Sequence, residues 1–159
     1  MAARASLLAD VYDALVDGFT AGLSVPVLDG PLLQSPSVEA WVMVGATELP
    51  PDIDGELAQS NSNRSAMGNG EFRDDQGFVT FSAWSWSGDP AAVRTCRRTA
   101  TDLLDQCEAV VAADPSLGGV LKFGFFADVG SSALTQWQTD KGCTVRATST
   151  VTYQTLLTP

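Results

Sequence analysis

Residues 90–113 have the clearest hydrophobic pattern in the chain, with apolar side chains repeating at helical spacing. At 100° per residue they fall within a stripe of about 120°. The stripe consists of Val93, Cys96, Ala100, Leu103, Leu104, Cys107, Val110 and Val111. Asp89 can cap this segment, and Pro90 stands in the first turn, where its missing N–H does no harm. The pattern predicts a helix that packs on a sheet and ends at Asp114-Pro115.

A second helix is predicted over residues 6–21, with Ser6 as its N-cap. Its apolar positions repeat at helical spacing, and three acidic residues fall largely on the other side. The apolar set is Leu7, Leu8, Val11, Leu15 and Phe19, and the acidic set is Asp10, Asp13 and Asp17.

Strand patterns fill much of the remaining chain. We expect a short extended piece at 25–28, whose proline suits a sheet edge, and strands at 38–46, 120–126, 134–139 and 143–156. A Gly/Ser turn at 128–132 and an Asp-Lys-Gly turn at 140–142 separate the last three of these strands. Along 143–156 an apolar face alternates with a threonine-rich face, and the apolar face should meet the helices.

Residues 71–86 read either as two strand halves joined by a turn at Asp75-Gln76-Gly77 or as one long bent strand. Trp84 and Trp86 share one face of this segment. The polar stretch 47–70 predicts a mobile loop, which is either a disordered insertion or a segment that orders on a partner. The whole pattern predicts a single α+β domain over residues 1–159, with a mixed, largely antiparallel sheet and two main helices packed on one face.

Charge is unevenly distributed along the chain, whose formal net charge is −10. Residues 1–56 contain nine acidic residues and one basic residue, whereas residues 57–159 contain ten and eight. Such a chain does not grip nucleic acid by neutralising phosphates. The acidic third is either a solvated surface or one side of a molecule that associates head to tail with its own copies.

Three of the nine basic residues, Arg94, Arg97 and Arg98, lie within five positions of the long helix. They form either a solvated helix face or a patch that docks the acidic side of another copy. Trp84 and Trp86 are core aromatics, or one of them lies in a subunit interface. The candidate interface, with another subunit or with a different protein, consists of Arg94, Arg97, Arg98, Trp84, Trp86, Asp52, Asp54, Glu56 and Arg64.

Catalytic chemistry finds little support in the sequence. The chain has no histidine, which removes Ser-His-Asp and Cys-His catalysis, and it has no Walker A, G-x-G-x-x-G or G-x-S-x-G motif. Asp52, Asp54 and Glu56 superficially resemble a calcium loop, but the twelve-residue pattern is absent. The three cysteines should be buried free thiols in a reducing cytoplasm. We therefore expect neither an enzyme nor a cofactor or metal, and no membrane segment.

The order of these elements resembles the tail terminator proteins of long-tailed bacteriophages and related minor tail and neck proteins. The matching stretches are VYDALVDG, the V-x-V-x-D-G piece at 25–30, EAWVMVG, FVTFSAWSWSGDP, CEAVVAADPSLGG and TVRATSTVTYQTLL. The resemblance covers nearly the whole chain and includes no catalytic signature.

This resemblance implies a virion protein that is assembled in the host cytoplasm and forms a six-membered ring at the head-proximal end of the tail. The implied partners are other copies of the chain, the tail tube protein and the head-tail connector protein, with DNA passing through the lumen without specific binding. The alternatives are a head-tail connector, stopper or completion protein, an acidic monomeric adaptor or inhibitor of a host protein, and, least supported, a small hydrolase.

Overall fold

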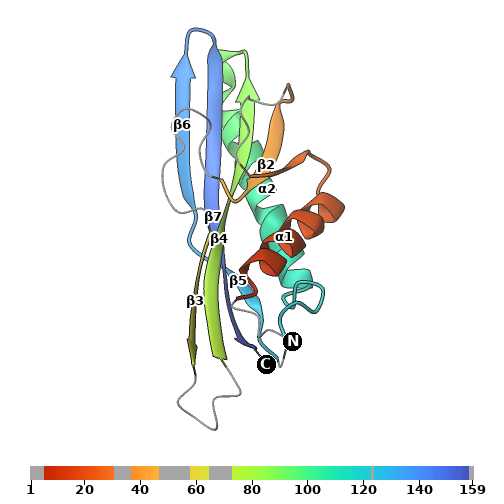
Figure 1. Cartoon of the computed structure of the whole chain (residues 1–159). Helices are drawn as coiled ribbons and strands as arrows, with labels where there is room; N and C mark the ends of the chain where they lie inside the picture. Colours follow the sequence, from red (N-terminus) through yellow and green to blue (C-terminus); the bar gives the residue numbers. More distant parts are fainter. Residues whose placement is uncertain (1–5, 31–36, 47–57, 65–72, 123, 158–159) are drawn as a thin grey trace.

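A single seven-stranded sheet with both helices on one face forms the body of the molecule (Figure 1). The computed structural model describes residues 6–30, 37–46, 58–64, 73–122 and 124–157. The elements are α1 (Leu8–Gly22), β1 (Val27–Asp29), β2 (Ala40–Val44), β3 (Ala58–Arg64), β4 (Arg73–Ser87), a 3-10 turn (Pro90–Ala92), α2 (Val93–Ala113), β5 (Ala127–Val129), β6 (Ala133–Thr139) and β7 (Gly142–Leu157). The expected α+β class is confirmed.

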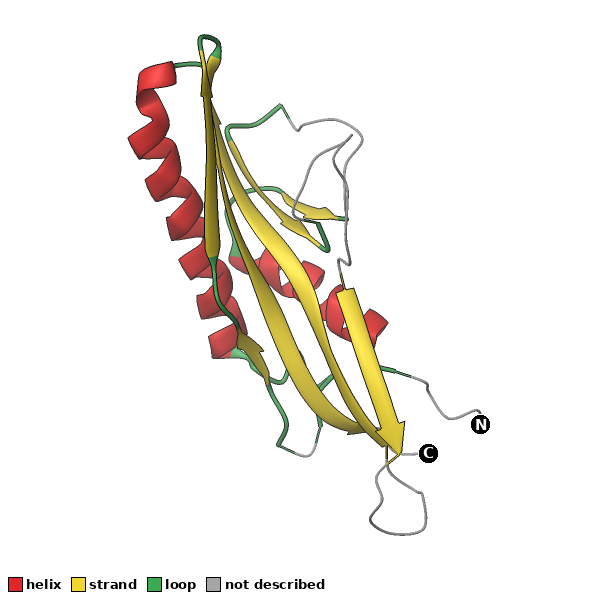
Figure 2. Ribbon diagram, turned by 90° about the vertical axis from the view of Figure 1, so that its left-hand side faces the viewer, coloured by secondary structure: helices red, strands yellow, loops and turns green. Residues whose placement is uncertain are grey.

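Two long antiparallel strands, β4 and β7, form the middle of the sheet and pair along their full length. The outer flank of each is shared by shorter strands (Figure 2). The first half of β4 pairs with β3 and its second half with β2, while β7 pairs first with β6 and then with β5. Among the described strands, β1 and β2 form the only parallel pair, so the sheet is mixed and largely antiparallel, as predicted.

The long helix forms as the sequence predicts. The side chain of Asp89 accepts a hydrogen bond from the backbone N–H of Ala91 at 2.8 Å, Pro90 opens the 3-10 turn that leads into α2, and α2 ends at Ala113. The apolar stripe faces the sheet: six of its eight members, Cys96, Ala100, Leu103, Leu104, Cys107 and Val111, are buried.

The first helix begins two residues later than predicted. Ser6 does not occupy the N-cap position, but its hydroxyl still accepts the backbone N–H of Leu8 at 3.0 Å. The helix runs through Gly18 to Gly22, and Gly22 allows it to approach α2 closely. A methyl group added at Gly22 would lie 2.5 Å from a methyl carbon of Val110.

The structure corrects the sequence analysis at two polar segments. Residues 58–64, expected within a loop, form β3. Residues 75–77, considered as a hairpin turn, lie inside β4, so that the interpretation as one long strand is correct. Asp75 is fully buried there. The rest of the expected loop, at 47–57 and 65–70, lies outside the described residues.

The strand expected at 120–126 is wrong for the described part of that segment. Here the chain makes a compact turn, with Leu117, Gly118, Gly119 and Gly124 at positive φ. Leu117 and Leu121 pack into the core, and Ala127 donates its N–H to the carbonyl of Pro115 at 2.8 Å. The strand begins only at Ala127, so β5 occupies part of the span expected to be a Gly/Ser turn.

The three cysteines are buried free thiols, as predicted. The fold adds one contact that their spacing does not reveal, because the Sγ atoms of Cys143 in β7 and Cys96 in α2 are 3.6 Å apart. Cys107 lies farther along α2 in the same core.

Candidate interaction surfaces

The face of the sheet opposite the helices carries a stack of three indole rings. Trp84 of β4 lies in the middle, with Trp41 of β2 on one side and Trp137 of β6 on the other. The ring centroids are 5.7 and 6.0 Å apart, and the planes are within 8° of parallel. The cross-strand register places Trp84 directly opposite Trp41. The stack therefore links three strands across this face.

Hydrogen bonds and a cation hold the stack in place. The indole N–H of Trp84 donates to the hydroxyl of Ser82 at 2.8 Å, and Ser82 donates to the carbonyl of Ala46 at 2.7 Å. The guanidinium of Arg146 lies 5.2 Å from the ring centroid of Trp137 and 5.7 Å from that of Trp84. Because such contacts typically contribute about 0.5–1 kcal/mol each, they favour one fixed arrangement of the rings.

The structure separates the two tryptophans that the sequence grouped together. Both lie on the face opposite the helices, but Trp84 is only 3% exposed whereas Trp86 is 45% exposed. Trp84 is thus a core residue, and Trp86 is a surface aromatic available to a partner. Trp137, which the sequence analysis did not single out, is 44% exposed.

The three arginines of α2 have different environments. Arg97 donates from Nε and Nη2 to the side-chain oxygen of Gln136 in β6, at 3.2 and 2.8 Å. Arg94 and Arg98 are exposed. Only Arg94 and Arg98 therefore remain as the exposed part of the arginine patch.

The outer surface of the helix layer carries opposite charges at its two ends. The first turns of α2 expose Arg94 and Arg98, and the helix from its middle onward exposes Asp102, Asp105 and Glu108. The last turns of α2 pack beside α1 through Val110, and α1 exposes Asp13 and Asp17. Arg94 and Glu108 are about 21 Å apart along the helix axis. The sequence order alone does not reveal that α1, with its exposed acids, packs against the last turns of α2.

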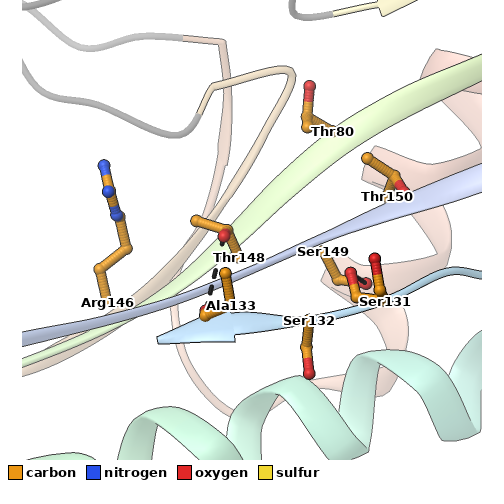
Figure 3. A pocket seen from close by; sticks show the side chains of 8 residues that line it. All are labelled: Thr80, Ser131, Ser132, Ala133, Arg146, Thr148, Ser149 and Thr150. Carbon is orange, nitrogen blue, oxygen red and sulfur yellow. Dashed lines mark hydrogen bonds between the residues drawn. The ribbon is translucent and has the colours of Figure 1, made fainter. Parts of the chain in front are cut away.

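A shallow polar hollow lies where β7 passes from β6 to β5 (Figure 3). It is lined by Thr80, Ser131, Ser132, Ala133, Arg146, Thr148, Ser149 and Thr150. This lining offers hydroxyl groups and one positive charge, but no carboxylate, thiol or imidazole that could act as a general base. The arrangement suits hydrogen bonding better than acid–base catalysis.

The remaining candidates from the sequence fall where the structure gives no side-chain geometry. Asp52, Asp54 and Glu56 lie outside the described residues, and Arg64 is placed only by its backbone, at the end of β3 opposite Arg73. Within the described ranges, no three Asp, Glu, Cys or His side chains cluster closely enough to hold a metal ion. Neither described helix has the length and apolar character needed to cross a membrane.

The sequence analysis missed Trp41, Trp137 and Arg146 as a unit. One signal was available: the tight turn at Asp140-Lys141 sets β6 against β7, so that Trp137 falls opposite Thr144 and beside Arg146. The pairing of β4 with β7, which brings Trp84 opposite Arg146, is long-range and has no local signal.

Comparison with known proteins gives a distant structural likeness. No protein-family model matches the chain, and no curated protein matches it. Among solved structures, a chain of "Virion of native gene transfer agent (GTA) particle" is similar at 11% identity, with 94% of this chain and 95% of that chain covered and a TM-score of 0.41. We therefore infer the role of the surfaces from their own residues.

Proposed function

We propose that this chain is a virion structural protein that associates with its own copies in a head-to-tail ring on the end of a phage tail tube. In this role the ring ends polymerisation of the tube protein and offers its other face to the head-tail connector. The role requires no catalytic group, in keeping with the lining of the polar hollow.

The observation that carries the proposal is the charge polarity of the helix layer. A basic end, formed by Arg94 and Arg98, and an acidic end, formed by α1 and the second half of α2, lie on the same surface. Two such molecules in the same orientation bring opposite charges together. A contact between different patches of identical copies is heterologous, and it closes into a ring when the rotation between copies allows it.

The resemblance to tail terminator proteins supports the same role. Its stretches fall in the elements that the resemblance implies: VYDALVDG in α1, EAWVMVG in β2, FVTFSAWSWSGDP along β4 and its turn, and TVRATSTVTYQTLL in β7. A ring of acidic subunits also suits passage of DNA, since like charges keep the duplex from sticking to the wall.

The proposed role is tested by adding the purified protein to growing tail tubes. We expect tubes of limited length with an extra ring at one end, visible by electron microscopy. Binding to heads instead of tubes would point to a connector or stopper protein. A chain that binds neither and remains monomeric would refute the proposal and favour an adaptor.

A further inference from the structure

Strand β6 leaves one edge of the sheet open. It pairs with β7 on one side, and within the described part of the chain no strand lies on its other side. All its residues except Thr135 are exposed, including Leu134 at 45% and Trp137 at 44%. Natural edge strands are usually guarded by charges, proline or a bulge. The sequence ALTQWQT contains no charge and no proline, so the strand itself carries neither of these guards.

The turn before β7 fixes which backbone groups of β6 point outward. Thr139 and Gly142 flank a two-residue turn, so they form a hydrogen-bonded pair, and such pairs recur at every second residue. Thr135 and Trp137 therefore direct their N–H and C=O groups to β7. Leu134, Gln136 and Gln138 direct theirs away from the sheet, where they can pair with another strand.

A matching edge lies on the opposite side of the sheet. Strand β3 also has seven residues, is uncharged from Ala58 to Asn63, and pairs only with β4 among the described strands. Three antiparallel pairings connect the two edges, β3 with β4, β4 with β7 and β7 with β6. Consequently β3 and β6 run in opposite directions, and two copies in the same orientation meet as an antiparallel pair.

We propose that β6 of one copy adds to β3 of the next copy, so that the sheets of adjacent subunits become continuous. This inference rests on the proposed ring and names the contact that builds it. The contact is heterologous, like the charge pairing of the helix layer, and therefore repeats around the ring. Backbone pairing of this kind supplies affinity through main-chain hydrogen bonds.

The two edges are displaced along the strands. The middle of β3 is opposite Gln76, and the middle of β6 is level with Ser85, nine positions along β4 (85 − 76). At about 3.3 Å per residue this displacement is about 30 Å. If the strands ran parallel to the axis of the assembly, each copy would be shifted along that axis and the copies would form an open helix. A closed ring therefore requires strands that are steeply inclined to the ring axis.

A proline at position 134 tests the contact without breaking the fold. Leu134→Pro removes an outward N–H that β7 does not use, and proline is tolerated at such edge positions. Leu134→Thr is the matched control, because it removes the apolar side chain but keeps the N–H. We expect Leu134→Pro to reduce self-association at least tenfold by analytical ultracentrifugation, and Leu134→Thr to change it less than threefold, with similar circular dichroism spectra.

Cysteine crosslinking provides a second measurement that does not depend on proline. Gln59 pairs with Phe78 on the face opposite the helices, the same face as Ala133, Thr135 and Thr139. A Gln59→Cys variant is mixed with Ala133→Cys, Thr135→Cys or Thr139→Cys and oxidised. We expect a covalent heterodimer in at least one mixture and none with unmodified protein.

Rings that persist in Leu134→Pro, with no crosslink in any mixture, would overturn the strand pairing while leaving the ring itself intact. A wild-type protein that is monomeric at all concentrations would overturn both proposals. If Leu134→Pro fails to fold, the crosslinks decide the question alone.

Discussion

Arg97 of α2 and Gln136 of β6 are joined by two hydrogen bonds, from Nε at 3.2 Å and from Nη2 at 2.8 Å to the same amide oxygen. This contact ties the first half of α2 to the outer strand of the sheet. The three arginines of α2 therefore differ, because Arg97 is hydrogen-bonded within the fold while Arg94 and Arg98 are exposed to solvent.

Reversing the outward charges should weaken self-association. We expect the Arg94→Glu/Arg98→Glu variant to raise the dissociation constant of the subunit contact roughly five- to thirtyfold, since each exposed pair is worth up to about 1 kcal/mol. The effect should shrink at high salt. Native mass spectrometry at two ionic strengths measures it, with Arg94→Lys/Arg98→Lys as control.

A complementary variant makes the charge test specific. Asp102→Arg/Asp105→Arg, mixed with the Arg94→Glu/Arg98→Glu protein, should restore mixed oligomers, because the opposite charges are again brought together. If the Arg94→Glu/Arg98→Glu variant forms the same oligomers as the wild-type chain, the charges of the helix layer do not hold the copies together.

Removing the middle ring of the tryptophan stack should destabilise the monomer. Trp84 is buried, contacts Trp41 and Trp137, and hydrogen-bonds Ser82. We expect Trp84→Ala to lower the free energy of unfolding by about 3–5 kcal/mol. Trp86→Ala, at an exposed position on the same strand, should cost less than about 1 kcal/mol. Similar urea midpoints for the two variants would show that the stack is not part of the core.

Asp75 should matter for the attachment of α1. Its Oδ2 accepts the backbone N–H of Leu7 at 2.7 Å and the hydroxyl of Ser6 at 3.1 Å. Asp75→Ala leaves that N–H without its acceptor, and we expect a loss of about 1–3 kcal/mol. The control is Asp74→Asn, at a partly exposed neighbouring position. Hydrogen exchange should show faster opening of the first turn of α1, and unchanged protection there would contradict the capping role.

Stability should fall in alkaline solution. Burial, with a smaller contribution from Asp29, raises the pKa of Tyr12 from 10.0 to about 12. Burial likewise raises the pKa of Tyr153 to about 12 and that of the Cys107 thiol from 9.0 to about 12. The neutral forms are favoured in the folded state, so the unfolded chain releases protons first. Stability should therefore be complete below pH 9 and decline between pH 9 and 12.

Urea unfolding between pH 7 and 11 measures this decline. A Cys107→Ala variant should lessen the decline that begins near pH 9, while Cys143, whose thiol pKa is also raised by burial, keeps part of it. Stability that is constant or rises across this range would contradict the assignment of buried neutral groups.

Local patterns predicted most of the fold. The helix stripes, the cap at Asp89, the edge position of the short strand that follows Pro26 and the alternation along β7 all follow from spacing and side-chain type. Strand β3 could not be predicted in this way, because Ala58–Arg64 is polar and gains its extended form from backbone pairing with β4. Leu121 and Val120 suggested a strand, but the positive-φ turn around Gly118 and Gly119 directs the chain elsewhere.

The candidate surfaces were less predictable, for a physical reason. Trp41, Trp84, Trp137 and Arg146 lie far apart in sequence, and only the sheet register brings them together. Likewise, the packing of α1 against the last turns of α2 depends on the close approach of Gly22 to Val110. Such features depend on long-range pairing, which a single sequence does not encode locally.

Electron microscopy of the purified protein, with mass measured on the same sample, tests the central claim most directly. The proposal predicts closed rings of identically oriented subunits around a hole wide enough for a DNA duplex. Monomers at every concentration, or two-fold symmetric dimers with no further association, would contradict it.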